Sequence, residues 1–183
     1  MNKTKDITRK EILDRLNAQA PEEILRKSKA IKEALFQDAG FKKAKVVMLY
    51  ASRDEEVGTW DTIKEALDEG KKVALPRCVS QAKVIPKEIT DIDTDLEKGT
   101  YSIYEPKSSQ QNVEIEEIDL VVVPGVAYDR ENNRLGRGKG YYDRFLKKLS
   151  PRTSTIGLAF DFQLLNKLPK DSHDIPVSRV ITN

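Results

Sequence analysis

The sequence contains few of the residues on which several classes of protein depend. Its 183 residues include one cysteine, one histidine and one tryptophan. The lone Cys78 has no second cysteine with which to form an intrachain disulfide or to share a metal ion. A disulfide scaffold and a cysteine-based zinc site are therefore excluded, and we expect Cys78 to be a buried, unreactive thiol in a reducing cytoplasm.

Long apolar runs and a strong excess of one charge are also absent. No apolar stretch approaches the ~20 residues of a membrane span, and the N-terminal segment is polar and charged. Charged residues make up 34% of the chain, but the formal net charge is only +2. We therefore expect a cytoplasmic protein that binds neither membranes nor nucleic acid. No heptad or long apolar stripe indicates a partner chain, so a monomer is expected.

Short apolar runs along the chain have the composition of β-strands. They lie at residues 46–50, 73–75, 120–123 and 155–159. The run at 120–123 is uninterrupted and rich in valine, which is typical of a strand buried on both faces of a parallel sheet. At this length the chain is expected to form one domain, residues 1–183. Its predicted fold class is α/β, with a mostly parallel central sheet flanked by helices.

Helical patterns lie between these runs, at residues 21–40, 59–70 and 141–149. The first begins at a proline, the second begins at a threonine expected to be its N-cap, and both end at a glycine. In the third, apolar residues recur at helical spacing and form one stripe. Residues 87–118 are poor in periodicity and are interpreted as connecting loops.

The segment at residues 119–149 says most about function. An apolar strand there leads into a loop rich in glycine and arginine, which in turn begins a helix. Glycine permits positive φ and a close approach of the backbone to a ligand, and a helix N-terminus carries positive partial charge. The loop residues with these properties or with a positive charge are Arg134, Gly136, Arg137, Gly138, Lys139 and Gly140. No acid lies among residues 134–140, so this loop is predicted to bind a polyanion.

Two familiar nucleotide motifs do not fit this loop. A Walker loop requires a glycine five residues before Gly138 and a serine or threonine after Lys139, where the sequence has Asn133 and Gly140. A dinucleotide fingerprint requires Gly-x-Gly-x-x-Gly, whereas this loop reads Gly-x-Gly-x-Gly. Neither a P-loop nor a Rossmann site is therefore predicted.

The loop and several other segments resemble the 5-formyltetrahydrofolate cyclo-ligases, also called methenyltetrahydrofolate synthetases. The resemblance rests first on PGVAYD at residues 124–129 and RLGRGKGYYDRFL at residues 134–146. Other matching landmarks are the spacing of Lys5 and Arg9, YASRDEEVGT at 50–59, LPR at 75–77, Glu105-Pro106, IGLAFDFQ at 156–163 and LPKDSHDIPVSRVIT at 168–182. Two positions depart from the family pattern: Gly58 stands where an acid is common, and Ser102 stands where glycine is often found.

The resemblance implies ATP-dependent conversion of 5-formyltetrahydrofolate, with or without a polyglutamate tail, to 5,10-methenyltetrahydrofolate, giving ADP and phosphate, with magnesium. In the family's scheme the formyl oxygen attacks the γ-phosphate, N10 of the folate attacks the resulting imidate-type phosphate, and phosphate departs as the ring closes. Such phosphoryl transfer depends on positioning and charge stabilisation more than on a strong base. The resemblance does not assign the group that accepts the N10 proton.

The resemblance also implies roles for individual residues. The ATP-binding residues would be Lys5, Arg9, Arg134, Leu135, Gly136, Arg137, Gly138, Lys139, Gly140, Tyr141 and Tyr142. Among them Arg137 and Lys139 would be catalytic, since they stabilise charge on the transferred phosphoryl group. The substrate-binding residues would be Ala51, Glu56 and Tyr128. The magnesium ligands would be Asp143 and Asp174.

Some of these roles compete with structural alternatives. Lys5 and Arg9 also fit the solvated basic face of a lysine-rich helix. Asp143 also fits a first-turn acid that only compensates the helix dipole. His173, beside Asp174, is more typical of a loop contact than of a general base, because no nucleophile accompanies it.

Two further residues match the family or suggest a pocket. Trp60 lies on an apolar helix stripe and is expected in the core rather than in a pocket. Gln163 either contacts substrate or ties down a loop.

Two other classes of function use the same basic loop: a sugar-phosphate isomerase-like enzyme on a similar scaffold, and a nucleic-acid-binding module.

Overall fold

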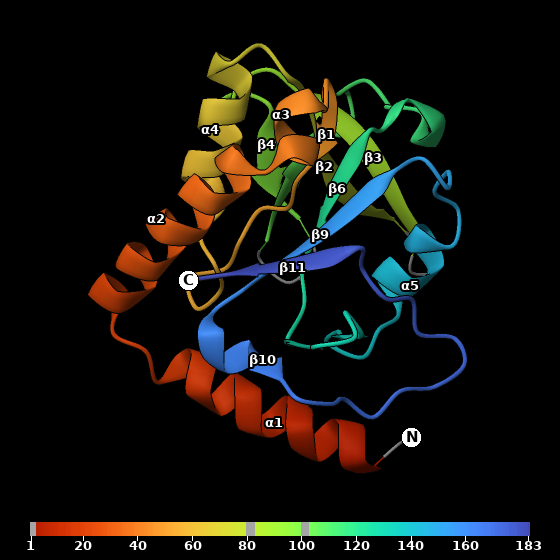
Figure 1. Ribbon diagram of the computed structural model, residues 1–183. Coiled ribbons are helices and arrows are strands. Elements are labelled where there is room, and N and C mark those ends of the chain that lie inside the picture. The colour runs from red at the N-terminus through yellow and green to blue at the C-terminus, as the bar shows by residue number, and fades with distance from the viewer. Residues whose placement is uncertain (1–2, 80–82, 100–102) are drawn as a thin grey trace.

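A computed structural model describes residues 3–79, 83–99 and 103–183 of the chain. Helices cover both faces of a central sheet, and two smaller sheets accompany it (Figure 1). Ser102, one of the two departures from the family pattern, lies outside the described residues. No helix among the described residues has both the length and the apolar character needed to cross a membrane.

The central sheet has six strands in the order β11-β9-β6-β1-β2-β3. All neighbouring pairs are parallel except β2 and β3, which form an antiparallel edge. Their bounds are β1 Val46–Met48, β2 Lys72–Val79, β3 Lys83–Ile89, β6 Leu120–Val123, β9 Ser154–Ala159 and β11 Arg179–Thr182. The predicted α/β class with a mostly parallel sheet is confirmed.

Alternating side chains of the sheet pack into two separate cores. In β6, Leu120 and Val122 pack in one core, and Val121 and Val123 pack in the other, as expected for a strand buried on both faces. The first core includes residues of helices α1 Lys3–Asn17, α2 Pro21–Gln37, α3 Ala39–Lys43 and α4 Trp60–Asp68. The second core includes residues of helix α5 Tyr141–Leu146.

The structure corrects the predicted helix ends in several places. The first helical segment breaks at Asp38, not at Gly40, because the Asp38 carboxylate accepts the Phe41 N–H at 2.9 Å and begins α3. Thr59 precedes α4 but does not cap it with its side chain. Its hydroxyl instead bonds the Tyr50 carbonyl and the Ser52 N–H, which holds the two ends of the β1–α4 loop together. The third helix ends at Leu146.

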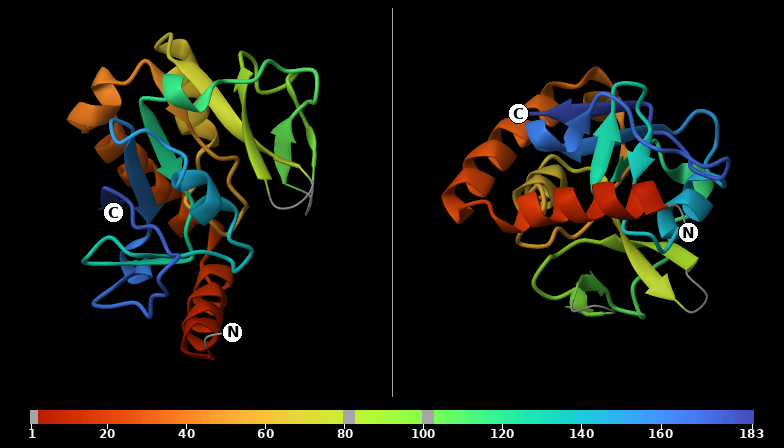
Figure 2. Two further views of the ribbon diagram at one scale, coloured as in Figure 1. Left: turned by 90° about the vertical axis from the view of Figure 1, so that its right-hand side faces the viewer. Right: turned by 90° about the horizontal axis from the view of Figure 1, so that it is seen from below.

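The interpretation of residues 87–118 as connecting loops is wrong in part. The segment contains the end of β3, an antiparallel pair formed by β4 Leu96–Lys98 and β5 Tyr104–Pro106, and a 3-10 turn, η3 Ile115–Glu117. In the left view of Figure 2 the green β4–β5 pair stands beside β2 and β3. Strands of three residues are too short to show a period of two, so their backbone pairing is settled only by tertiary contact.

A small three-stranded sheet supports the phosphate loop, residues 134–140. It comprises β7 Ala127–Asp129, β8 Arg134–Leu135 and β10 Leu164–Leu165, the last of which follows the turn η4 Asp161–Gln163. The carboxylate of Asp129 is fully buried at the end of β7 and accepts the backbone N–H groups of Glu131, Asn133 and Leu168 at 2.9–3.0 Å. It therefore joins the β7–β8 hairpin to the segment that leads toward Asp174.

The sheet order places a topological switch between β1 and β6. The chain leaves β1 to form β2 on one side, whereas β6 pairs with β1 on the other side. Ligands of open α/β sheets bind in the crevice at the carboxyl ends of such diverging strands. In this chain those ends are followed within three residues by Tyr50-Ala51 and Pro124-Gly125.

Candidate active site

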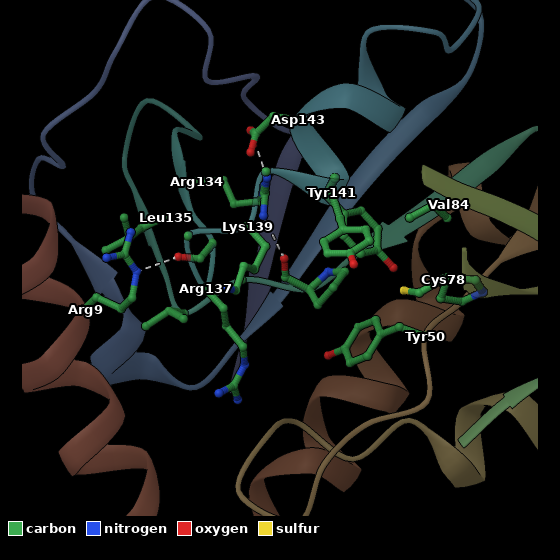
Figure 3. A pocket seen from close by; sticks show the side chains of 18 of the residues that line it. Arg9, Tyr50, Cys78, Val84, Arg134, Leu135, Arg137, Lys139, Tyr141 and Asp143 are labelled. Atoms are coloured by element: carbon green, nitrogen blue, oxygen red, sulfur yellow. Dashed lines mark hydrogen bonds and ion pairs between the residues drawn. The ribbon is translucent and has the colours of Figure 1, made fainter. Parts of the chain in front are cut away.

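A cavity of about 1000 Å³ lies at this switch (Figure 3). Its walls come from α1, the β1–α4 loop, β2, β3, β5, the turn after β6, the phosphate loop with the first turn of α5, and Asp171, His173 and Asp174. Every predicted site residue except Tyr128 lines it. The fold therefore brings the predicted ATP-binding, folate-binding and metal-binding groups into one chamber.

Tyr128 is the correction. Its side chain is fully buried beneath the cavity, and its hydroxyl donates to the Val123 carbonyl at 2.5 Å. The ring fills the space beside Gly125 and Gly157; a Cβ at Gly125 would lie 2.6 Å from the Tyr128 ring carbon Cζ, and a Cβ at Gly157 would collide with the ring as well. Tyr128 is thus a core residue that supports the cavity floor rather than a ligand contact.

The phosphate loop has the predicted backbone character at two of its three glycines. Gly138 and Gly140 have φ values of 94° and 66°, a region that other residues rarely adopt, whereas Gly136 does not have positive φ. The Gly136 carbonyl instead accepts a hydrogen bond from Nε of Arg9 at 2.9 Å. This contact, drawn in Figure 3, docks α1 onto the loop, so Arg9 faces the cavity and not solvent.

Arg134 and Asp143 form a buried ion pair at the base of the loop. Nη2 of Arg134 lies 2.9 Å from Oδ1 of Asp143, and the Arg134 side chain is only 3% exposed. Nη1 of Arg134 donates to the Pro124 carbonyl at 3.2 Å, while its Nε is buried with no hydrogen-bond partner among the described residues. Asp143 also accepts the Ile175 N–H at 3.4 Å, which brings the first turn of α5 next to Asp174.

Lys5 forms a second buried pair on the α1 side of the cavity. Its Nζ bonds the carboxylate of Asp174 and lies 2.8 Å from Asp171. Burial alone would lower the pKa of Lys5, but the hydrogen bonds to the two aspartates outweigh burial and raise it. The adjacent His173 side chain is 66% exposed and its Nε2 lies 3.8 Å from Asp174. Lys5 therefore faces the cavity and not solvent.

The two predicted magnesium carboxylates are thus each paired with a predicted ATP-binding cation. Asp143 is held by Arg134 and Asp174 by Lys5. Oxygen ligands of this kind suit magnesium, which takes one or two carboxylates together with phosphates and water. A triphosphate would give both cations a new partner and leave both carboxylates for the ion, so the residues present fit magnesium brought by a nucleotide.

Several cavity residues were not predicted from the sequence. Tyr50, Pro76, Cys78 and Val84 form an apolar side, and Figure 3 shows Cys78 and Val84 away from Arg9 and Arg134. Glu105 lies beside Cys78 and accepts its N–H at 3.2 Å. The sequence marked Glu105 only as a landmark and Cys78 only as an unreactive thiol, because no local pattern indicated that β2 and β5 would meet there.

Cys78 was expected to be a buried, unreactive thiol. The structure agrees with the low reactivity but only in part with the burial. The side chain is half-buried and reaches the cavity. Burial, with a contribution from the neighbouring Glu105 carboxylate, raises the pKa of the thiol to about 12. The thiolate is therefore scarce at neutral pH, as expected for an unreactive cysteine.

Two residues with open roles are structural. Trp60 packs against the core and meets Tyr104 edge to face, with ring centroids 5.8 Å apart, as expected for a core residue. Gln163 ties down a loop: its Oε1 accepts the Phe160 N–H at 2.8 Å, and its Nε2 donates to the Val126 carbonyl at 3.0 Å. It thereby fixes the turn between β6 and β7 that contributes Gly125 to the cavity.

Comparisons with known proteins agree along the whole chain. The model of the 5-formyltetrahydrofolate cyclo-ligase family matches residues 1–183. A 5-formyltetrahydrofolate cyclo-ligase of Mus musculus is 30% identical over 99% of this chain and 94% of its own length, and one of Haemophilus influenzae is 33% identical over 76% of each chain.

Solved structures show the same relationship. A 5,10-methenyltetrahydrofolate synthetase of Aquifex aeolicus superposes with a TM-score of 0.86 at 35% identity, covering 97% of this chain and 89% of that one. A second, from Mycoplasma pneumoniae, has a TM-score of 0.79 at 26% identity, covering 100% of this chain and 99% of that one. Sequence, fold and site together place this chain in the 5-formyltetrahydrofolate cyclo-ligase family of enzymes.

Proposed function

We propose that this enzyme uses ATP and Mg²⁺ to cyclise 5-formyltetrahydrofolate to 5,10-methenyltetrahydrofolate, releasing ADP and phosphate. The observation that carries the proposal is the single cavity, in which the cationic phosphate loop and the acid predicted to bind folate stand together. A reaction that joins a nucleotide to a folate requires both ligands in one chamber. Family membership supplies the substrate class.

The nucleotide end is defined by its positive charge. Lys5, Arg9, Arg134, Arg137 and Lys139 all line the cavity. Lys139 forms no ion pair within the part of the chain that the structure describes, so it is available to a phosphate at no cost in existing contacts. These side chains would hold the triphosphate and stabilise the charge that builds up on the transferred phosphoryl group.

Asp143 and Asp174 would hold the magnesium ion. When bound, the ion would neutralise phosphate charge during phosphoryl transfer. The oxygen-only donor set and its position beside the phosphate loop support this role. Asp171, whose carboxylate groups with His173 and Asp174, would stay with Lys5 and steady the loop that carries Asp174.

The folate end is defined by an acid beside apolar surface. Glu56 lines the cavity from the β1–α4 loop, as does Ala51, which is buried and follows the end of β1 by three residues. A carboxylate accepts hydrogen bonds from the N–H donors of a pterin ring, and the apolar side formed by Tyr50, Pro76 and Val84 suits its aromatic faces. A folate bound in this way would have its formyl group directed toward the phosphate loop.

The residues act chiefly by placing reacting atoms. An N-formyl group is an amide, so its oxygen leaves only after it has been converted to a better leaving group. Held between Glu56 and the loop cations, the formyl oxygen would attack the γ-phosphate, and Arg137 and Lys139 would stabilise the transferring charge. N10 would then attack the activated carbon as phosphate leaves.

Two alternative functions were considered from the sequence, a sugar-phosphate isomerase-like enzyme and a nucleic-acid-binding module. Family membership favours neither of them. The expectations of a single domain, a monomer and a cytoplasmic location stay predictions.

The test is absorbance in the methenyl-folate band with 5-formyltetrahydrofolate, Mg²⁺ and ATP. We expect an ATP-dependent rise in absorbance. Its rate should be lower by about 100-fold or more in Arg137→Ala, because the guanidinium that stabilises charge on the transferred phosphoryl group is lost. Arg152→Ala removes an exposed arginine outside the cavity and should leave the rate unchanged. A folded wild-type protein that shows no rise would defeat the proposal.

A further inference from the structure

The carboxylates of the cavity differ in one respect. Six carboxylate side chains line it: Asp6, Glu56, Glu105, Asp143, Asp171 and Asp174. Five of them lie within 4.0 Å of a lysine or arginine nitrogen, supplied by Lys5, Arg9, Arg134 or Arg137. Among the described residues, Glu105 has no cationic partner at this distance. A carboxylate without a cation keeps its affinity for a proton.

Glu105 is also the most buried of these six residues, and it lies on the apolar side of the cavity. The residue is only 5% exposed and lies on β5, next to Cys78 of β2. Gly99 leaves space for it, because a Cβ at that position would lie 2.7 Å from Oε2 of Glu105. The backbone at Gly99 therefore leaves room for the carboxylate beside Cys78, which Figure 3 shows away from Arg9 and Arg134.

We propose that Glu105 is the catalytic base that accepts the N10 proton when the folate ring closes. The inference rests on the proposed function. As N10 attacks the phosphorylated formyl carbon, the new C–N10 bond forms from the nitrogen lone pair. The N10–H bond then breaks, its electrons stay on nitrogen, and the proton passes to the Glu105 carboxylate. The C–O bond to phosphate breaks, phosphate takes that electron pair, and the N5–CH–N10 unit is left as a cationic amidinium.

The other candidate bases are less suited to this step. Asp143 and Asp174 are paired with Arg134 and Lys5 and are assigned to the magnesium ion, and Glu56 is paired with Arg137 and is assigned to the pterin ring, so all three carboxylates are already engaged. His173 stands at the exposed rim, where it borders a second hollow with Gly138 and Lys139. That position is on the nucleotide side.

The surroundings of Glu105 favour a proton acceptor. Burial raises the pKa of Glu105; the N–H and thiol of Cys78 and the charge of Arg77 oppose this, and Glu97 on β4 adds to it. The neighbouring strand β3 contributes the apolar Val84 to the cavity. Its charged residues are engaged or exposed: Lys87 donates to two backbone carbonyls, Glu88 pairs with Lys72, and Lys83 is exposed. A base with a raised pKa takes a proton more readily in the transition state.

The test separates phosphoryl transfer from ring closure. Rapid-quench measurement of ADP and stopped-flow absorbance of methenyl-folate are recorded for wild type, Glu105→Gln, Glu105→Asp and Glu116→Gln. Glutamine keeps an oxygen that can accept the Cys78 N–H but cannot accept the proton. In Glu105→Gln we expect one equivalent of ADP at close to the wild-type rate, followed by ring closure slowed about 100-fold or more. Glu116, an exposed glutamate of η3 that lies outside the cavity, is the control and should behave as wild type.

The pH dependence gives a second readout that a structural role would not change. Wild-type ring closure should slow as the pH falls and Glu105 becomes protonated, Glu105→Asp should keep this limb, and Glu105→Gln should lose it. Ring closure in Glu105→Gln at the wild-type rate, or an equal loss of ADP formation and ring closure in a folded variant, would overturn the inference. Wild type that forms neither ADP nor methenyl-folate would instead refute the proposed function.

Discussion

Arg137 of the phosphate loop is bonded to Glu56, the acid predicted to bind folate. Nη2 of Arg137 lies 2.7 Å from Oε1 of Glu56 and also 2.7 Å from Oε1 of Glu55. Burial alone would lower the pKa of Arg137, but its bonds to the two glutamates outweigh burial and raise it. Arg137, which is expected to bind the nucleotide, thus neutralises the charge of Glu56, which is expected to bind folate.

This pair predicts that the two ligands bind cooperatively. A triphosphate competes with Glu56 for Arg137, so nucleotide binding should release Glu56 to the pterin. Titration calorimetry should show folate binding at least about 5-fold tighter with a non-hydrolysable ATP analogue and Mg²⁺ than without them. In Arg137→Ala the factor should fall to about 1. Glu55→Gln, which changes a partner of Arg137 outside the cavity, should retain cooperativity, and an undiminished factor in Arg137→Ala would contradict the prediction.

The buried carboxylate of Asp129 predicts a large effect on stability. Asp129→Asn would place an amide NH₂ where the carboxylate accepts backbone N–H groups of Asn133 and Leu168, leaving at least one of them unpaired. We expect a loss of about 2–3 kcal/mol in the free energy of unfolding, measured with urea. Asp14→Asn, at an exposed position in α1, should change it by less than about 0.5 kcal/mol. Equal stability of the two variants would show that Asp129 is not a structural centre.

The pair between Asp38 and Arg179 predicts a pH-dependent contribution to stability. Burial alone would raise the pKa of Asp38, but hydrogen bonds from Arg179 and Phe41 outweigh burial and lower it below the ordinary value of 3.8. Since the folded pKa is depressed, the stabilisation is complete above the ordinary value and is lost as the pH falls through the folded pKa.

Asp38→Asn tests this contribution because asparagine is also a good N-cap and only the charge is removed. At neutral pH we expect a loss of about 1 kcal/mol, the low end for a charged hydrogen bond, since Arg179 is partly exposed. The difference from wild type in thermal unfolding should shrink as the pH falls below about 4. A difference that does not vary between pH 7 and pH 3.5 would exclude this ionisation as its cause.

The thiol of Cys78 provides a chemical probe of the cavity. With a pKa of about 12, it has far less thiolate at pH 7.5 than an ordinary cysteine. Its greater nucleophilicity offsets part of this, and we expect alkylation by iodoacetamide to be about 100-fold slower than that of a free thiol. The same protein in denaturant should react at the ordinary rate, and Cys78→Ser should not be labelled at all. Rapid labelling of the folded protein would show that the thiol is not held in its protonated form.

Local features of the chain were predictable because neighbours in sequence decide them. The valine-rich run of β6 and the helical stripe of α5 follow from side-chain periodicity, although α5 ends at Leu146, earlier than its apolar stripe. The glycines at 138 and 140 adopt the positive φ that the loop requires. By contrast, the three-residue strands β4 and β5 have no periodicity of their own and form only where their backbones pair.

The α/β class, the glycine- and arginine-rich loop and the family resemblance were all readable from the sequence, since they depend on residues close together in the chain. Which charges meet depends on the tertiary structure. Lys5 and Asp174 are 169 positions apart, and Arg137 and Glu56 are 81 positions apart. It likewise buried Tyr128 beneath the cavity and brought Glu105 to its apolar side. Ion pairs and burial depend on distance in space, and that distance is set by how the sheet orders its strands.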